Sequence, residues 1–362
     1  MFRDYNFGVP SLPFVSGREM VGTVVKAAST PNARIREGDV VIVPSTDYRD
    51  LRKAAFQQYS IASEFNAIRL PQEISISSGS ILGVAFVSAV LALGICMGVN
   101  FKDIEDGPDL LKIVRKLDPE GLPNDIRQEC LNGIELGDRA RSGDWLVIWG
   151  ASSTCAHVAK QIARLAGLRI ISVVDGAKHG LRLSSTPEIR PDLLVDSHEP
   201  QRAIDIIKRA TGDRARFGFD TAGKETAGHL LRSLATSPFL VTSVVEDSKT
   251  PRRKDSKLPS PPATPSGTAP NPAGSHLVGL TGLPKADIPE GVSLHSVPIK
   301  LFHAVPEVGE ALSVWCERLL VKGLLVPPEV VGTVDGLEGI NGGLDRMRRR
   351  EISGGRLVAV LP

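Results

Sequence analysis

Residues 143–175 carry the clearest structural signal in the chain and read G-D-W-L-V-I-W-G-A-S-S-T-C-A-H-V-A-K-Q-I-A-R-L-A-G-L-R-I-I-S-V-V-D. The run 145–149 is apolar without alternation, which is typical of a strand buried on both faces. After a turn of small residues, apolar positions recur at helical spacing until Gly167. A second apolar run, 170–174, ends at Asp175. The stretch therefore predicts a strand–helix–strand unit.

A unit of this length and order is the arrangement that binds dinucleotides. The start of the helix would attract a pyrophosphate, and small turn residues would let the backbone approach it. An acidic side chain at the end of the second strand would meet the adenosine ribose hydroxyls. The predicted cofactor site consists of Gly150, Ala151, Ser152, Ser153, Thr154, Cys155, Ala156, Asp175, Lys178, His179, Ala222 and Gly223.

The glycine fingerprint of such sites is degraded here. The pattern G-x-G-x-x-G would need glycine at 150, 152 and 155, where the chain has Gly150, Ser152 and Cys155. A register of small residues at every third position, Gly150, Ser153 and Ala156, fits better. Taken alone, the motif leaves open a parallel α/β domain that binds no cofactor.

Composition sets the broad class. A chain of 362 residues is too long for one ordinary core, so two domains are expected. A hydrophobic content of 42% and a charged content of 23% are those of a soluble globular protein. The net charge of +2 gives no reason to expect nucleic acid or a membrane as a partner. The longest apolar run, 81–99, is interrupted by glycine and serine and predicts a buried helix.

The ends and the cysteines point to the cytoplasm. The N-terminus shows no apolar segment of the kind found in signal peptides. The four cysteines, Cys96, Cys130, Cys155 and Cys316, are scattered without a C-x-x-C pair. A zinc cluster is therefore not expected. Reduced thiols and a cytoplasmic location are expected instead.

Four segments are predicted. Residues 1–95 form a β domain with strands at 19–26, 39–44, 55–62 and 66–70, and residues 96–142 form a charged linker with short helices at 110–117 and 125–131. Residues 143–303 form the nucleotide-binding domain, with later strands at 239–245 and 293–302. Residues 304–362 add helices at 305–322 and 337–347 and strands at 330–334 and 356–361.

Residues 246–275 interrupt the nucleotide-binding domain. They are rich in proline, serine, threonine and alanine and show no apolar periodicity. Such a segment cannot bury enough surface to offset its ordering entropy, so a disordered surface loop is predicted. It could be a docking or phosphorylation site or simply a tolerated insertion.

Three motifs, in this order, resemble the medium-chain dehydrogenase/reductase superfamily. Residues 13–26, P-F-V-S-G-R-E-M-V-G-T-V-V-K, resemble its P-x-x-x-G-x-E-x-x-G-x-V segment, and residues 36–43, R-E-G-D-V-V-I-V, resemble its G-D-x-V segment. The tail 351–358, E-I-S-G-G-R-L-V, is similar to its closing strand. The resemblance implies an α/β fold: a doubly wound Rossmann sheet plus a GroES-like β-barrel domain that the C-terminal tail completes.

Two departures from the family pattern bear on metal and length. Zinc-dependent members have G-H-E where this chain has Gly17-Arg18-Glu19, and arginine cannot ligate zinc. Residues 82–88 offer no cysteine, and the four-cysteine structural lobe is absent. The chain is therefore expected to be zinc-free, with no metal ligands. It also begins where the family is already well into its first domain, so an N-terminal segment is expected to be missing.

The resemblance is strongest to fungal zinc-free members, some of which are enoyl reductases beside polyketide synthases. It implies an NAD(P)H-dependent oxidoreductase that passes hydride to an activated C=C of an enoyl or quinone-type substrate, in a setting such as secondary metabolism. The alternative is a catalytically inactive relative that binds nucleotide or a partner. Family dimers further suggest a homodimer through strand 293–302, with a small molecule as substrate.

Roles for individual residues stay open. The candidates for catalysis are Tyr5 and Arg18. A surface or packing role fits Tyr5 better than catalysis, and Arg18 could neutralise substrate or cofactor charge or simply pair with Glu19 or another acid. Asp175 favours NADH because it would repel a 2′-phosphate, whereas Lys178, His179 and Arg182 could bind that phosphate. Zinc-free relatives mostly use NADPH, so both cofactors remain in play.

Overall fold

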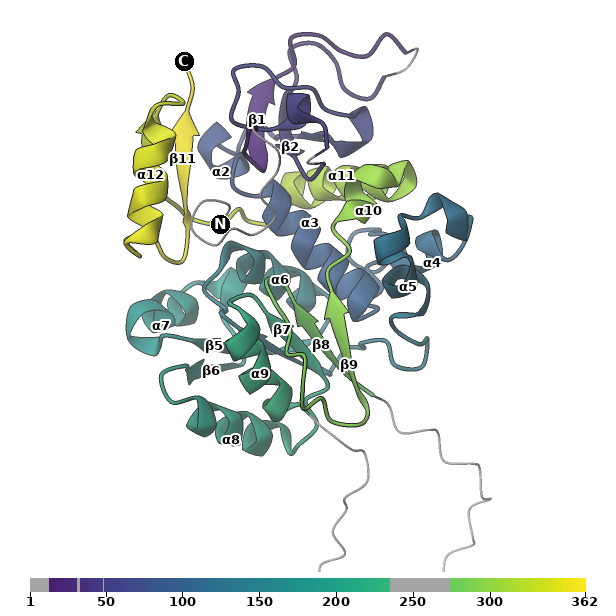
Figure 1. Cartoon of the computed structure of the whole chain (residues 1–362), viewed down its shortest axis with the longest axis vertical. Coiled ribbons are helices and arrows are strands. Elements are labelled where there is room, and N and C mark those ends of the chain that lie inside the picture. Colours follow the sequence, from purple (N-terminus) through teal and green to yellow (C-terminus); the bar gives the residue numbers. More distant parts are fainter. Residues whose placement is uncertain (1–12, 31–32, 48, 235–273) are drawn as a thin grey trace, which may run out of the picture.

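The computed structural model describes residues 13–30, 33–47, 49–234 and 274–362 (Figure 1). Tyr5, the predicted strand 239–245 and nearly all of the predicted insertion 246–275 lie outside the described residues. In Figure 1 the large parallel sheet fills the lower half of the molecule, and the smaller β elements from both ends of the chain lie above it.

A six-stranded parallel sheet forms the nucleotide-binding part. Its strands lie in the order β6-β5-β4-β7-β8-β9, with every neighbouring pair parallel. This is the strand order of doubly wound dinucleotide-binding folds and confirms the predicted Rossmann sheet. The strands are β4 Trp145–Trp149, β5 Arg169–Val174, β6 Leu193–Asp196, β7 Phe217–Asp220, β8 Ser275–Gly279 and β9 Val292–Ser296.

Helices cover both faces of this sheet. Along β4, Leu146 and Ile148 pack into one cluster with α6 (Thr154–Leu165), whereas Val147 and Trp149 pack into another with α8 (Pro200–Thr211) and α9 (Lys224–Ser233). Both faces of β4 are therefore dry, which is why its sequence shows no alternation. Helix α7 (Gly176–Ser185) lies on the α6 side through Leu183.

The β elements at the two ends of the chain form two separate small sheets. Near the N-terminus, β1 (Glu19–Thr23), β2 (Val40–Pro44) and β3 (Ile68–Arg69) form an antiparallel sheet. In the tail, β10 (Val330–Asp335) and β11 (Arg356–Val360) pair in parallel. Helix α12 (Gly339–Arg348) packs on this pair. Within the described ranges the predicted barrel is therefore two sheets rather than one closed cylinder.

A buried helix crosses the centre of the molecule. α2 (Ile76–Gly79) precedes α3 (Gly83–Leu91), which continues as a π-helical stretch, η3 (Ala92–Cys96). By length and apolar composition, the described run Ile76–Cys96 could cross a membrane, but 89% of its most apolar window is buried inside the molecule. That burial agrees with the core helix predicted at 81–99.

Residues 96–142 contain the two predicted short helices, α4 (Leu110–Val114) and α5 (Asn124–Asn132), joined by η4 (Pro119–Gly121). Their apolar side chains enter the main core beside the central helix, which the charged composition of the segment did not predict. The buried members are Leu110, Leu111, Val114, Leu122, Ile126 and Cys130.

Helices α10 (Lys300–Ala304) and α11 (Pro306–Val321) follow the sheet. The predicted strand 293–302 is wrong over its second half: β9 ends at Ser296 because Pro298 cannot donate to a strand ladder, and α10 begins at Lys300. The predicted strand 55–62 is wrong as well. Its residues bend, and Gln57 and Ser60 hydrogen-bond to nearby backbone carbonyls instead of a neighbouring strand. The remaining short helices are η1 Leu51–Lys53, η2 Glu64–Asn66 and η5 Pro187–Ile189.

Candidate functional site

The turn after β4 lies where the strand order reverses, because β5 pairs with one side of β4 and β7 with the other. Ligands of open α/β sheets bind at this switch point, outside the carboxyl ends of the strands. Gly150 has a φ of +76°, and a Cβ there would lie 2.7 Å from Thr221 Oγ1. Glycine is therefore required at this position both by the backbone conformation and by the close approach of the residue that follows β7.

The turn leads directly into the N-terminus of α6. Ser153 caps the helix: its Oγ accepts from the Ala156 N–H at 3.1 Å and donates to Thr221 Oγ1 at 2.9 Å. The first N–H groups of a helix have no intrahelical partners and carry a partial positive charge. Burial raises the pKa of the Cys155 thiol to about 11, so this residue is a neutral part of the site.

Glu19, Arg356 and Thr154 connect this helix start to the N-terminal sheet and the tail. Arg356 Nε donates to Thr154 Oγ1 at 3.1 Å, and Arg356 Nη1 lies 2.9 Å from Glu19 Oε1. Glu19 Oε2 accepts from the Val84 N–H of α3 at 2.8 Å. A guanidinium is thus fixed at the positive end of α6, where an anionic ligand would gain from both.

An open cleft runs between these elements. Residues of β1, α3, the α6 start and the tail line it, including Arg18, Glu19, Thr154, Cys155 and Arg356. The sequence singled out Arg18 but missed Arg356, whose closing-strand position was noted only as a family likeness. No local spacing could have revealed it, since its partners Glu19 and Thr154 lie far away in the chain.

The end of β5 forms an acidic edge. Asp175 caps α7 by accepting from the Lys178 N–H at 2.9 Å, and Asp196, at the end of β6, accepts from the Gly176 N–H at 2.8 Å. His198 Nδ1 lies 3.0 Å from Asp196 Oδ1, and this hydrogen bond raises the pKa of His198. The Asp175 carboxylate is partly exposed, and its contact with ribose hydroxyls stays a prediction.

The basic residues after Asp175 do not gather at this edge. Lys178 is exposed, whereas His179 is buried and lies 2.9 Å from Ser353 Oγ of the tail. Arg182 contacts the Ser152 carbonyl at 3.5 Å and Glu329 of the tail at 3.8 Å. His179 and Arg182 therefore connect α7 to the C-terminal tail.

Ala222 and Gly223 follow β7 beside the turn. Their N–H groups donate to Asp220 Oδ1 at 3.1 and 2.8 Å. Burial raises the pKa of Asp220 to about 6. Because these two N–H groups already donate to Asp220, they hold the loop beside Gly150 and are not free to donate to a ligand.

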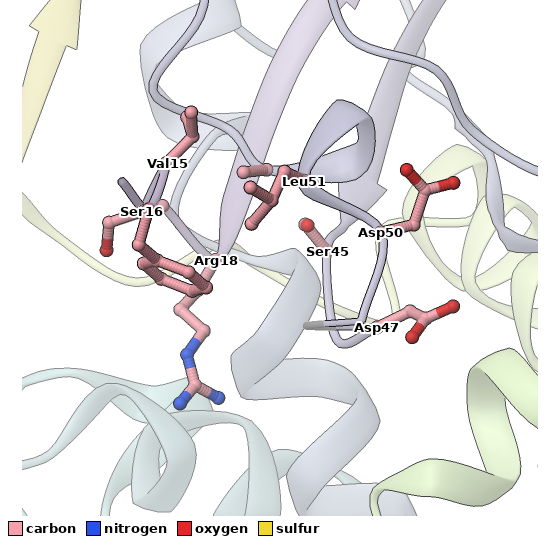
Figure 2. Close-up of a pocket in the computed structure, with 10 residues that line it drawn as sticks. Val15, Ser16, Arg18, Ser45, Asp47, Asp50 and Leu51 are labelled. Atoms are coloured by element: carbon pink, nitrogen blue, oxygen red, sulfur yellow. The ribbon is translucent and has the colours of Figure 1, made fainter. Parts of the chain in front are cut away.

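Arg18 lines a second, smaller pocket together with Ser45, Asp47 and Asp50 (Figure 2). Its side chain points away from the carboxylates of Asp47 and Asp50, and burial lowers the pKa of its guanidinium. Tyr5, the other candidate for catalysis, lies outside the described residues. Both assignments remain predictions.

Comparison with known proteins points to the same class of fold. No protein-family model matches the chain. A zinc-type alcohol dehydrogenase-like protein of Schizosaccharomyces pombe is 32% identical over 106 residues, or 29% of this chain and 27% of that protein. Human quinone oxidoreductase is 22% identical over 205 residues, or 57% of this chain and 47% of that enzyme. The chain thus spans about half, or less, of the length of these first relatives.

A trans-enoyl reductase of Aspergillus japonicus is 23% identical over 171 residues, or 47% of this chain and 40% of that enzyme. Among solved structures, Escherichia coli quinone oxidoreductase in complex with NADPH superposes with a TM-score of 0.63 at 15% identity. That match covers 99% of this chain and 86% of the enzyme. In sequence the chain is thus similar to quinone oxidoreductases, a trans-enoyl reductase and an alcohol dehydrogenase-like protein, and it shares the fold of the solved quinone oxidoreductase.

Proposed function

We propose that the protein is an NAD(P)H-dependent oxidoreductase that reduces an activated C=C in an enoyl or quinone-type substrate. The observation that carries the proposal is the Arg356 guanidinium at the start of α6, at the switch point of a Rossmann sheet. The relatives named quinone oxidoreductase and trans-enoyl reductase support the choice of reaction class.

The residues at the switch point fit a dinucleotide. Gly150 leaves a cradle that a Cβ would fill, and the first N–H groups of α6 together with Arg356 would hold the pyrophosphate. Asp175 would accept from the adenosine ribose hydroxyls. When bound, the cofactor supplies the hydride, and the protein orients it and stabilises the charge that develops on the substrate oxygen. Arg18, which lines the cleft, is our candidate for that last role.

Two features point to different cofactors. The carboxylates of Asp175 and Asp196 lie close together at the edge that we propose for the ribose, and they would repel a 2′-phosphate and favour NADH. The Escherichia coli enzyme, in contrast, was solved with NADPH. Lys178 is exposed beside the edge and could pair with a phosphate. We therefore propose that the protein binds a reduced nicotinamide dinucleotide. Titration decides whether this cofactor carries a 2′-hydroxyl, as in NADH, or a 2′-phosphate, as in NADPH.

The test is titration of the full-length protein with NADPH and with NADH, followed by quenching of Trp149 fluorescence at the end of β4. We expect one of the two to bind, and Arg356→Gln to weaken that binding at least about tenfold, which is ~1.4 kcal/mol. The matched control is Arg202→Gln, which removes a charge from an exposed pair on the opposite face of the sheet.

Turnover is then measured with enones and quinones. Reduction of such a substrate at the expense of the bound cofactor supports the proposal. Failure of a folded protein to bind either cofactor would overturn it. Binding without turnover across both substrate classes would favour the alternative of a nucleotide-binding relative that lacks catalysis.

A further inference from the structure

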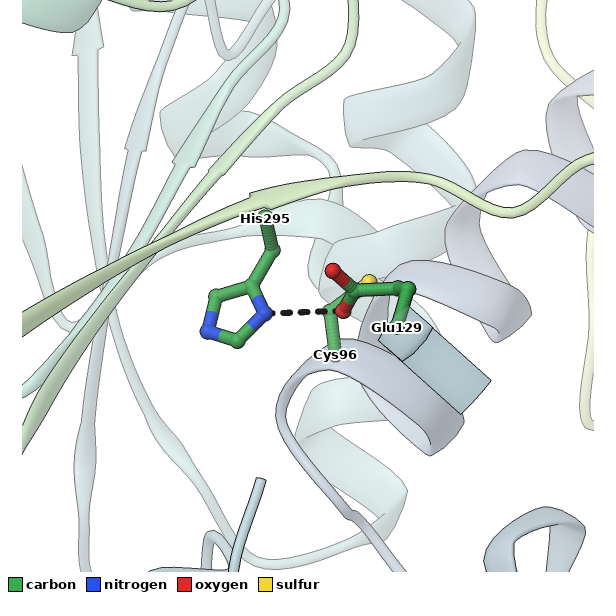
Figure 3. Close-up of side chains that lie close together, drawn as sticks. All are labelled: Cys96, Glu129 and His295. Carbon is green, nitrogen blue, oxygen red and sulfur yellow. Dashed lines mark hydrogen bonds and ion pairs between the residues drawn. The ribbon is translucent and has the colours of Figure 1, made fainter. Parts of the chain in front are cut away.

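Three potential ligand side chains meet beneath the edge of the parallel sheet (Figure 3). Cys96 ends the central helix at η3, Glu129 lies on α5 and His295 lies on β9. Their ligand atoms, Cys96 Sγ, a Glu129 carboxylate oxygen and a His295 ring nitrogen, all lie within 4.8 Å of one another. His295 Nδ1 is 2.8 Å from Glu129 Oε1. Cys96 and His295 are buried and Glu129 is partly buried.

A second buried histidine stands behind His295. His276 Nδ1 lies 2.9 Å from His295 Nε2. His276 is only 2% exposed, and its Nε2 has no hydrogen-bond partner among the described residues and lies 3.9 Å from Asp138 Oδ2. An imidazole that carries a single ring proton can donate from only one of its two nitrogens.

The positions of the ring protons on His295 and His276 decide whether every polar atom in this group has a hydrogen-bond partner. If neutral His295 donates from Nδ1 to Glu129, its Nε2 must accept from His276 Nδ1. His276 Nε2 is then a bare acceptor that faces the Asp138 carboxylate. A cation on His295 Nδ1 reverses the direction of these hydrogen bonds. His295 then donates from Nε2 to His276 Nδ1, and the proton on His276 Nε2 faces Asp138. Metal-bound histidines make such outer contacts to carboxylates as a rule.

We propose that Cys96, Glu129 and His295 bind one zinc-class divalent ion, with His276 and Asp138 as outer partners. Thiolate, imidazole and carboxylate are the three ligand types that Zn²⁺ takes in proteins. Binding displaces the Cys96 thiol proton to solvent, and the proton of His295 moves from Nδ1 to Nε2. The two ligand charges then balance the ion, which a buried site requires. Because Glu129 is partly exposed, the ion can enter from its side, and a water can bind there as the fourth ligand.

The proposed site differs from the nucleotide cleft in place and purpose. Cys96 lies twelve residues beyond Val84 along the central helix, a rise of about 18 Å from the cleft. The site ties α5 and β9 to that helix, so its role is structural. It departs from the zinc-free expectation of the sequence, which rested on missing C-x-x-C pairs and on Arg18, because here the ligands come from three distant segments.

The competing explanation needs no metal. A doubly protonated His295 would form an ion pair with Glu129 and donate to His276, which satisfies the same donors. The ligand atoms of a second group, Asp175, Asp196 and His198, also lie within 4.8 Å of one another, but this group is exposed or partly exposed and its carboxylates already accept from backbone N–H groups. Metal titration distinguishes the metal-free ion pair of His295 and Glu129 from the proposed metal site.

The full-length protein is stripped with a chelator and titrated with Co²⁺, and Zn²⁺ affinity is measured by competition. We expect one equivalent to bind and a thiolate-to-cobalt charge-transfer band to appear. Cys96→Ser should abolish that band. The matched control is Cys130→Ser, which alters a buried free cysteine next to Glu129 that is not one of the three ligands. Absence of stoichiometric binding, or a band that persists in Cys96→Ser, overturns the proposal.

One measurement does not depend on a variant that folds. X-ray absorption of the wild-type protein loaded with one equivalent of Zn²⁺ should show a single sulfur neighbour at about 2.3 Å, with nitrogen and oxygen as the remaining ligands. His295→Gln should lower Zn²⁺ affinity at least about tenfold. A first shell without sulfur would show that the ion binds elsewhere, and it would refute the assignment.

Discussion

Gly150 illustrates how one residue decides both the turn and the site. Its φ of +76°, and the 2.7 Å that would separate an added Cβ from Thr221 Oγ1, make Gly150→Ala costly in two ways. We expect a loss of about 1–3 kcal/mol of unfolding free energy, together with weaker cofactor binding. Chemical denaturation and the fluorescence titration measure the two effects.

Gly228→Ala is the control for that substitution. Gly228 lies inside α9, and a Cβ there meets nothing within 4 Å. Because alanine favours a helix over glycine, this variant should gain up to about 1 kcal/mol and leave cofactor binding unchanged. Equal stability of both variants would show that the tight turn at Gly150 is absent in solution.

Lys160 is a buried cation without a carboxylate partner among the described residues. It is 1% exposed, and its Nζ donates to the Ala151 carbonyl at 2.9 Å. Burial lowers the pKa of Lys160 to about 7, from 10.5. Between these values the unfolded chain holds a proton that the folded chain lacks. Stability therefore rises with pH from about 7 to about 10.5, and this contribution is lost as the pH falls through that window.

Lys160→Met should remove this dependence. At pH 7 the variant should be more stable than the wild type by roughly 1–4 kcal/mol, because a buried charge is replaced by an apolar side chain of similar length. The advantage should shrink as the pH approaches about 10. Denaturant unfolding of both proteins at about pH 7 and about pH 9.5 tests the claim, and a difference that does not change with pH would refute it.

At the scale of elements, Glu19 and Arg356 join β1, α3, α6 and β11. The Glu19 carboxylate is buried, and it pairs with Arg356 at 2.9 Å while it accepts from Val84. In a double-mutant cycle with Glu19→Gln and Arg356→Gln, we expect a coupling free energy of about 1–2 kcal/mol. Because Arg356 is partly exposed, solvent screens the pair and keeps the value below that of a fully buried one.

The control cycle uses Glu199 and Arg202, which pair at 3.8 Å with both side chains largely exposed. Its coupling should fall within about 0.5 kcal/mol of zero. Urea unfolding of the wild type and the six variants supplies the free energies for both cycles. A coupling at Glu19–Arg356 that is no larger than in the control would mean that the tail is not held to α6 by this pair.

Elements with dense local signals could be predicted from the sequence. β4 has the expected bounds, and α6 and β5 lie within two residues of theirs, because β4 is buried on both faces and Ser153 and Asp175 cap the helices that follow. The stretch 55–62 had apolar residues but also side chains that bond to the backbone, and local bonds prevailed over pairing. The sequence predicted only those residues of the candidate site that lie in one continuous stretch. Arg356 was missed because tertiary folding brings it to Thr154 from a distant part of the chain.

At the scale of the whole molecule, the parallel sheet has two ends, at β6 and at β9. An end strand presents unpaired backbone groups and can extend its sheet through a two-fold axis. The shortened strand β9 still provides such an edge, so we retain the prediction of a homodimer through β9. Light scattering during size-exclusion chromatography should give twice the mass of 38.7 kDa.

Ser293→Lys tests which edge is used. Ser293 is exposed on β9, and two copies of the new lysine would face each other near the two-fold axis and repel, so the variant should elute as a monomer. Ser197→Lys places the same charge beside the opposite edge, after β6, and should leave the dimer intact. A monomeric wild type at every concentration would refute the dimer. A dimer that only Ser197→Lys disrupts would place the interface at β6, where Asp175 and Asp196 would bring the two ribose edges together.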